Sequence, residues 1–208
     1  MIIDISVRVD KDTPIWAGNL YPKTTSLSNM IDGDTYNETS LEMNMHTGTH
    51  VDAPLHFIED GQSIDQMDTD IFIGTAFVVS LPDVKKITSK DLDRIDLPQN
   101  ISRLLFKTTN SLLWDKKDSA FVKDYVGITK DVADWIVSKN INLVGIDYLS
   151  ISTFKETVEV HNILLKEGIA ILEGINLNEV EEGDYELVCL PLKITNAEAA
   201  PTRAVLIK

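Results

Sequence analysis

Residues 46–56 read HTGTHVDAPLH and hold three of the four histidines of the chain together with one aspartate. Imidazole and carboxylate groups are the ligands that borderline divalent metals accept. Three imidazoles and one carboxylate within eleven residues therefore predict a metal site with a proton-transfer group beside it. The spacing alone selects neither the metal nor the reaction.

The backbone of this stretch is expected to bend, because neither regular structure brings the ligands together. On a helix, at about 100° per residue, His46 and His50 share a face, but Asp52 lies about 240° from His46. On a strand all three share a face, yet His46 and His50 lie about 13 Å apart at roughly 3.3 Å per residue. Gly48 can bend without steric cost, and Pro54 interrupts any helix or strand that follows.

Length and composition indicate one α/β domain over residues 1–208. The 208 residues are 43% hydrophobic, enough to bury one sizeable core. A net charge of −14 argues against nucleic acid and anionic membranes as partners, since clustered Lys and Arg bind both. The start, MIIDISVRVDKD, lacks the pattern of a secretory signal, and no apolar run is long enough to span a bilayer. We therefore expect a soluble cytoplasmic protein with a small-molecule substrate.

Hydrophobic patterning predicts strands alternating with helices, which is typical of a mixed sheet with covering helices. Strands are predicted over residues 2–9, 38–45, 75–81, 102–109, 143–147, 169–172, 185–194 and 203–207. Helices are predicted over 89–94 and 129–138, a helical segment over 163–166, and loops over 10–20 and 57–74. The strand at 38–45 is expected to lead straight into the histidine-rich stretch. Residues 110–127 show no clear period and are expected to form a long excursion that serves as a lid.

Further candidate residues lie near the ends of these elements. Glu173 follows the apolar run IAIL, where a carboxylate is costly unless it is paired or metal-bound. His161 lies just before the predicted helical segment, and the two residues are candidates for a second half-site. Asp147 ends a strand, and a binding role and a capping role fit it equally. Trp16 lies in a loop, where the pattern favours a ring that caps the core edge over one that lines a pocket. Cys189, the single cysteine, lies in an apolar strand, which predicts core packing.

The motif HTGTHVDAPLHF resembles the HxGTHxDxPxHF motif of the cyclase-like metal-dependent hydrolase family, whose best-known members are bacterial kynurenine formamidases. The segment TPIWAGN resembles the Pro-x-Trp-Pro-Gly-Asp loop of that family, and GIDYLSI resembles its GIDxxS strand end. His161 and Glu173 have the expected spacing, and EAAPTRAVL resembles the C-terminal segment. The resemblance covers nearly the whole chain.

The resemblance implies a swivelling β/β/α-type fold, a homo-oligomer (dimer or tetramer) and a centre of two divalent metals, zinc or manganese. The implied ligands are His46, His50 and Asp52 for the first metal, and Asp52, Glu173 and His161 for the second. His56 is implied as the general acid/base. Trp16 occupies the family's substrate-contact position, which changes its expected role from core-edge ring to pocket wall.

The implied reaction is metal-dependent amide hydrolysis, with N-formyl-L-kynurenine cleaved to L-kynurenine and formate as the leading hypothesis. Ala17 and Asn19 replace the proline and aspartate usual in the kynurenine formamidase loop, so the metal chemistry is better defined than the substrate. One alternative is a hydrolase of the same family that opens a cyclic amide or lactone such as isatin. The other is a non-catalytic metal-binding or assembly protein, against which His56 counts because metal binding does not require it.

Overall fold

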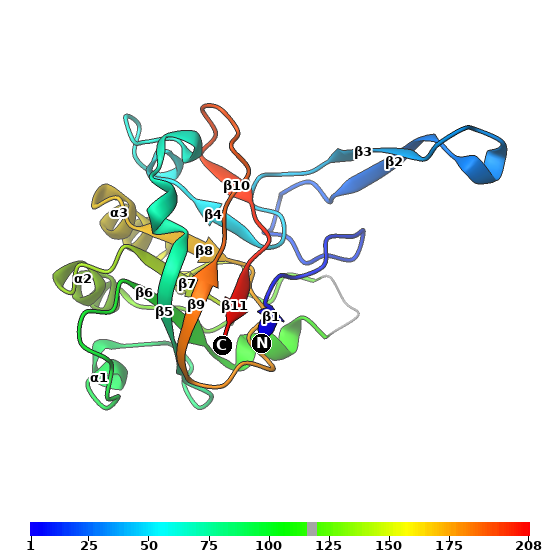
Figure 1. Ribbon diagram of the computed structural model, residues 1–208. Helices are drawn as coiled ribbons and strands as arrows, with labels where there is room; N and C mark the ends of the chain where they lie inside the picture. Colours follow the sequence, from blue (N-terminus) through cyan, green and yellow to red (C-terminus); the bar gives the residue numbers. More distant parts are fainter. Residues whose placement is uncertain (116–119) are drawn as a thin grey trace.

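A mixed sheet forms the centre of the structure, a computed structural model that describes residues 1–115 and 120–208 (Figure 1). In these described residues the sheet has nine strands, in the order β1-β11-β9-β5-β6-β7-β8-β4-β10. The bounds are Ile2–Asp4 (β1), His50–Asp52 (β4), Ile73–Ser80 (β5), Arg103–Lys107 (β6), Leu143–Ile146 (β7), Ala170–Glu173 (β8), Gly183–Val188 (β9), Ala199–Pro201 (β10) and Val205–Ile207 (β11). Neighbours from β5 to β8 pair in parallel, and the other neighbours pair antiparallel.

The α-helices lie together on one side of this sheet (Figure 1). They are α1 (Ser89–Leu92), α2 (Lys130–Ser138) and α3 (Thr157–Lys166). Fully buried side chains join them to the strands, among them Leu104 of β6, Ile146 of β7, Ile136 of α2 and Leu164 of α3. The predicted class, an α/β protein with a mixed sheet and covering helices, is confirmed. None of the helices in the described part of the chain combines the length and apolar character of a membrane span.

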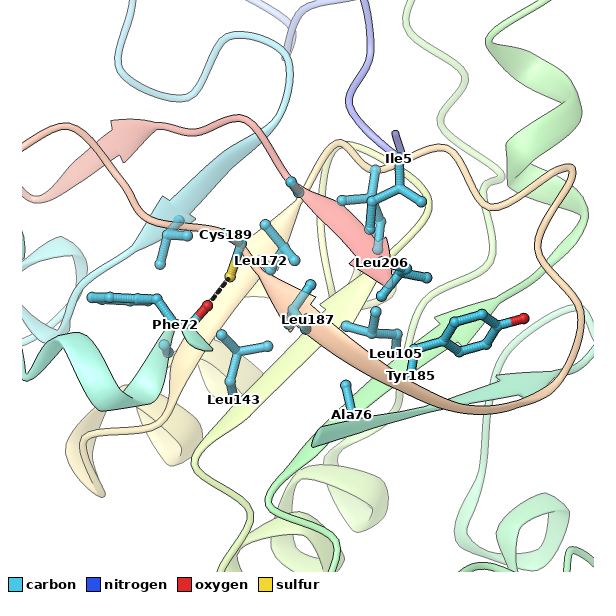
Figure 2. Packing of buried hydrophobic residues seen from close by; sticks show 14 of the residues in the cluster. Ile5, Phe72, Ala76, Leu105, Leu143, Leu172, Tyr185, Leu187, Cys189 and Leu206 are labelled. Atoms are coloured by element: carbon cyan, nitrogen blue, oxygen red, sulfur yellow. Dashed lines mark hydrogen bonds between the residues drawn. The ribbon is translucent and has the colours of Figure 1, made fainter. Parts of the chain in front are cut away.

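A second apolar cluster covers the opposite face of the sheet (Figure 2). Leu105 of β6 and Leu172 of β8 point into it, together with Leu187 of β9. Cys189 is fully buried there, with its Sγ 3.5 Å from the carbonyl oxygen of Phe72, and burial raises the pKa of its thiol to about 12. The core-packing prediction for this cysteine is confirmed. Because both faces are covered, the parallel strands are continuous apolar runs.

A hairpin of two strands, β2 (Lys23–Ser28) and β3 (Glu38–Glu42), projects away from the body as an arm (Figure 1). Its apolar side chains are exposed, including Leu27 (60%), Ile31 (92%) and Leu41 (55%). The prediction that residues 38–45 lead straight into the histidine-rich stretch was wrong in its end point. β3 ends at Glu42, and turns separate it from β4. Alternation alone could not show that, among the described residues, this strand pairs only with β2.

Most other predicted elements are confirmed within a few residues, and four differ. β1 ends early, and Ser6 keeps a single bridge to Ile175. α3 begins six residues before the predicted segment, because the alternating TVEV at its start does not have a helical period. β9 ends at Val188, before the predicted end at 194, and Pro191 beyond it has no N–H to donate to a ladder. β10, with the sequence AAP, has no strand signal of its own.

Short 3-10 helices complete the fold. They are η1 (Met30–Asp32), η2 (Pro54–His56), η3 (Ile64–Gln66), η4 (Thr69–Ile71) and η5 (Thr109–Leu113). η3 and η4 lie within residues 57–74, where a loop was predicted. η2 begins at Pro54, where its lack of an N–H costs nothing, and it ends at His56.

Candidate metal centre

The pairing of β4 with β8 assembles the centre. β4 is antiparallel to β8, with His50 opposite Glu173, and the turns at Gly48 and Gly174 lie against each other. Both glycines have φ of 69°, and a Cβ on Gly174 would stand 2.1 Å from the carbonyl oxygen of Gly48. The positive φ of Gly48 confirms the bend predicted there. At Gly174 glycine is required because of both the positive φ and the close approach. Thr49 Oγ1 donates to the carbonyl of Gly174 at 2.5 Å and holds the two turns together.

Two groups of side chains with metal-ligating atoms share Asp52. The first is His46, His50 and Asp52, and the second is Asp52, His161 and Glu173; in each group the candidate ligand atoms lie within 4.8 Å of one another. Oδ1 of Asp52 is 2.9 Å from Nδ1 of His46 and 3.4 Å from Nε2 of His50. Its Oδ2 is 3.9 Å from Nε2 of His161, which is itself 3.3 Å from Oε1 of Glu173. All five residues that were predicted as ligands are thus brought together.

Buried polar atoms in this cluster lack partners. Both carboxylate oxygens of Asp52 and Nε2 of His50 are fully buried and accept or donate no hydrogen bond within the described residues. Leaving such groups unpaired costs free energy, so their convergence favours a bound cation. Burial raises the pKa of Asp52, but the neighbouring His46 and His50 outweigh it and hold that pKa well below the ordinary value. The donor set of imidazole and carboxylate fits a divalent metal such as zinc or manganese.

Backbone carbonyls orient two of the histidines. Nδ1 of His50 donates to the carbonyl of Gly48 at 2.9 Å, and Nδ1 of His161 donates to the carbonyl of Thr157 at 2.7 Å. A carbonyl oxygen can only accept, so each ring has a proton on Nδ1 and directs Nε2 toward the carboxylates. This arrangement is typical of metal-binding histidines.

His56 lies beside the centre but belongs to neither ligand group. Its ring centroid is 4.2 Å from that of His46 and 6.1 Å from that of His161. Burial lowers the pKa of His56 below its ordinary value of 6.5, which favours the neutral imidazole at pH 7. A neutral ring next to the ligand groups can accept a proton and return it.

A cavity of about 380 Å³ opens onto the ligand groups. Its lining combines the metal-centre residues with aromatic and polar side chains: Trp16, Asn19, Asn44, His46, His56, Phe57, Leu149, Ser150, Thr157, His161, Glu173 and Glu198. The sequence did not single out Phe57, which stacks on His161 at 4.8 Å, although its place directly after His56 was an available signal. Glu198 was also missed as a site residue, although it opens the segment EAAPTRAVL, whose resemblance to the family was an available signal.

Trp16 forms part of the cavity wall and also packs against an aromatic cluster. Its ring is 4.8 Å from Phe121 and stacks on Phe154 at 5.6 Å. Phe121 and Tyr125, which also contacts Trp16, belong to the excursion at 110–127. The described part of the excursion therefore supports the wall of the cavity. The prediction of a lid also covers residues 116–119, which lie outside the described residues.

Asp147 does not reach the cavity. Its carboxylate accepts hydrogen bonds from the backbone N–H and hydroxyl of Thr108, at 2.8 Å each. It accepts two more from the N–H and hydroxyl of Ser111, at 3.0 and 2.8 Å. Of the two roles that fitted this residue equally, the capping role is supported, because the four bonds hold the start of η5.

The fold and the two ligand groups together define an α/β protein with a divalent metal centre, and the comparisons agree. Residues 3–153 match the Cyclase family model, described as "Putative cyclase". The chain is 37% identical over 218 residues to Cyclase-like protein 3 of Oryza sativa subsp. japonica, covering 100% of this chain and 80% of the relative. The chain therefore belongs to the cyclase family, as the histidine motif indicated.

Two further relatives cover almost the whole of both chains. Kynurenine formamidase of Geobacillus thermodenitrificans (strain NG80-2) is 36% identical over 207 residues, covering 99% of this chain and 97% of the relative. A solved structure described as a potential metal-dependent hydrolase with cyclase activity superposes with a TM-score of 0.86 at 31% identity. That match covers 99% of this chain and 96% of the other. The fold is thus shared over nearly its full length.

Proposed function

We propose that the protein is a metal-dependent amide hydrolase that cleaves N-formyl-L-kynurenine to L-kynurenine and formate. One observation carries the proposal: two ligand groups that share Asp52 face a cavity in which His56 stands free of both groups. The full-length similarity to a kynurenine formamidase supports hydrolysis of a C–N amide bond. A silent metal-binding protein would not need an unliganded histidine at this position.

The proposed ligands are those of the two groups, and Asp52 would serve both. A divalent metal supplies Lewis acidity, which polarises the amide carbonyl and makes water acidic enough to ionise near neutral pH. The chain contributes the geometry: the carbonyls of Gly48 and Thr157 orient two histidine ligands, and burial excludes bulk water from Asp52. Zinc and manganese both fit this donor set.

His56 is proposed as the proton carrier. As a neutral imidazole it accepts a proton at its free ring nitrogen from the attacking water, and it then donates that proton to the nitrogen of the departing arylamine. An arylamine anion is a poor leaving group, so this donation is needed for the C–N bond to break. Acid/base help of this kind is typically worth about 10²–10⁴-fold in rate.

The cavity supports an aromatic substrate of modest size. Trp16 and Phe57 provide aromatic faces on its wall, and we place the kynurenine ring against Trp16. Asn19 lines the same cavity without the negative charge of the aspartate usual in the formamidase loop. The absence of a charge at this position favours, as the second candidate, a neutral cyclic amide such as isatin.

The projecting arm supports a homo-oligomer. A hairpin of two strands is marginal in water by itself. This one exposes Leu27 of β2 and Leu41 of β3, and the connection between the strands exposes Met30, Ile31 and Tyr36. We propose that a second copy of the chain covers this arm. Light scattering should then give a dimer or tetramer mass, and a monomer at micromolar concentration would contradict this part of the proposal.

A substrate panel tests the proposed reaction. The purified protein, loaded separately with Zn²⁺ and Mn²⁺, should hydrolyse N-formyl-L-kynurenine and lose that activity on chelation. Isatin serves as the competing substrate, and a kcat/KM that is higher for isatin would replace the first candidate with the second. Full metal occupancy without hydrolysis of either compound or of simple formanilides would contradict both.

A further inference from the structure

His46 is oriented differently from the other two histidine ligands. His50 and His161 donate Nδ1–H to backbone carbonyls and direct Nε2 toward the carboxylates. In His46 the two nitrogens are exchanged: Nδ1 lies 2.9 Å from Oδ1 of Asp52, and Nε2 lies 3.5 Å from Oε1 of Glu198. The ring nitrogen that faces away from Asp52 therefore meets a backbone carbonyl in His50 and His161, but the carboxylate of Glu198 in His46.

The sheet holds Glu198 at this position. It precedes β10, whose Ala199 is paired with Asp52 of β4. The N–H of Ala53 donates to the carbonyl of Glu198 at 2.9 Å, which ties the backbone of Glu198 to the strand that carries two ligands. The Glu198 side chain is 41% exposed at the cavity, so it can rotate toward the ring.

His46 has the greatest need for such a partner. It lies in the turn before β4, and its side chain is 16% exposed, whereas those of His50 and His161 are 1% and 2% exposed. A rotation of the ring by half a turn would replace Nδ1 with a carbon atom that cannot bind a metal. An acceptor at Nε2 opposes this rotation and fixes the proton on Nε2, which leaves Nδ1 free as a ligand.

We propose that Glu198 is a positioning residue that accepts the Nε2–H of His46 and so orients Nδ1 toward the metal held with His50 and Asp52. The inference rests on the metal centre of the proposed function. The separation of 3.5 Å is about 0.3 Å beyond the usual limit of an N–H···O bond, a gap that rotation of a partly exposed side chain closes. A partner of this kind typically contributes about 10–100-fold to metal affinity.

A second role for Glu198 makes a different prediction. Glu198 and Asn44 line the same cavity, so the carboxylate could instead bind a cationic group of the substrate. A substrate contact would change KM and leave the affinity for metal unchanged. A positioning role changes metal affinity even when no substrate is present.

The test is titration of the metal-free, full-length protein with Co²⁺ and Zn²⁺ against a competing chelator. Glu198→Ala should weaken one of the two binding steps by about tenfold, the lower end of the expected range because the carboxylate is partly exposed, and should alter the visible spectrum of the Co²⁺ form. Glu198→Gln should show a smaller loss, since its amide oxygen still accepts the N–H without the charge. Glu59→Gln, which removes an exposed carboxylate outside both ligand groups, is the matched control and should bind metal as the wild type does.

A double variant provides the second arm. In a His46→Ala background, Glu198→Gln should have no further effect on metal affinity, because the ring that it orients is gone. Wild-type affinity and spectrum in Glu198→Ala, or a change confined to KM, would overturn the proposal.

If Glu198→Ala does not fold, as judged by circular dichroism, Glu198→Gln alone decides the outcome. Because metal binding is measured without turnover, failure of the amide hydrolysis assay would contradict the proposed function and leave the role of Glu198 intact. A wild type that binds no metal would refute both proposals.

Discussion

The two ligand groups of the centre share Asp52 but are built in different ways. His46, His50 and Asp52 lie within seven residues of one stretch, and His46 remains partly exposed beside Glu198. The second group joins Asp52 to His161 on α3 and Glu173 on β8, and all three are buried. The first group is formed by local backbone geometry, whereas the second requires the sheet pairing and the packing of α3. We therefore expect a substitution of Asp52 to weaken metal binding by both groups, and a substitution of His46 or His161 to weaken binding by one group.

The largest effect is expected at the shared ligand. Asp52→Asn removes the carboxylate common to both groups, so both metals should be lost or bound much more weakly. Turnover should fall by about 10³-fold or more, because a catalytic metal supplies several kcal/mol and each 1.4 kcal/mol is tenfold in rate. Metal content by mass spectrometry and hydrolysis of N-formyl-L-kynurenine measure this in one sample. Retention of one full metal equivalent would show that Asp52 is not shared.

His46 belongs only to the first group and His161 only to the second, so substituting each should affect one metal and leave the other bound. His46→Ala should remove one metal equivalent and leave a folded protein, since this side chain lies partly in solvent. His161→Ala should remove the other equivalent and also destabilise the metal-free protein by about 1–3 kcal/mol, because the buried Glu173 loses the imidazole at 3.3 Å and keeps only the N–H of Ile151 and the ring of His50 nearby. Urea unfolding and metal counting follow both effects. Equal stability losses in the two variants would remove the distinction between an exposed and a buried group.

Sequence spacing predicted the first group because its ligands need only one bent stretch of backbone. Glu173 was found because a carboxylate at the end of IAIL is costly, and with His161 it was predicted as a second half-site. The link of this half-site to Asp52 depended on the family resemblance, since no local pattern encodes the register of β4 with β8. The parallel strands β5 to β8 were predicted because strands that are buried on both faces are apolar runs in the sequence. β10 could not be predicted, because AAP becomes a strand only by pairing with β4, and the position of Glu198 depends on that pairing.

Two glycines with the same backbone conformation test whether the contact between the turns holds the groups together. Gly174 and Gly168 have φ of 69° and 74°, but a Cβ would meet the carbonyl of Gly48 only at Gly174 and has open space at Gly168. Gly168→Ala should therefore cost about 1–2 kcal/mol from the left-handed backbone alone. Gly174→Ala should cost more and weaken both metals. Equal effects of the two variants on stability and metal affinity would show that the close approach is unimportant.

The smallest effect is expected from a change remote from both groups. Asp131 accepts hydrogen bonds from the N–H of Ser89 and the hydroxyl of Thr129, and although burial alone would raise its pKa, these bonds lower it to about 2 from 3.8. Because the folded pKa lies below the ordinary value, the stabilisation is present above about pH 4 and is lost as the pH falls toward 2. Asp131→Asn should lower the free energy of unfolding by about 0.5–1 kcal/mol at pH 6, and by less at pH 3. Urea unfolding of the metal-free protein measures this, and any loss of metal from the variant at pH 7 would indicate that global destabilisation also explains the larger effects.

The central claim is that the histidine-rich stretch divides into metal ligands and a separate proton carrier. The most direct test compares His56→Ala with His50→Ala for metal content and turnover in the same preparations. The account predicts that His56→Ala keeps the wild-type metal content and loses about 10²–10⁴-fold in kcat, whereas His50→Ala loses metal and activity together. If His56→Ala loses metal as badly as His50→Ala, the separation of roles is wrong.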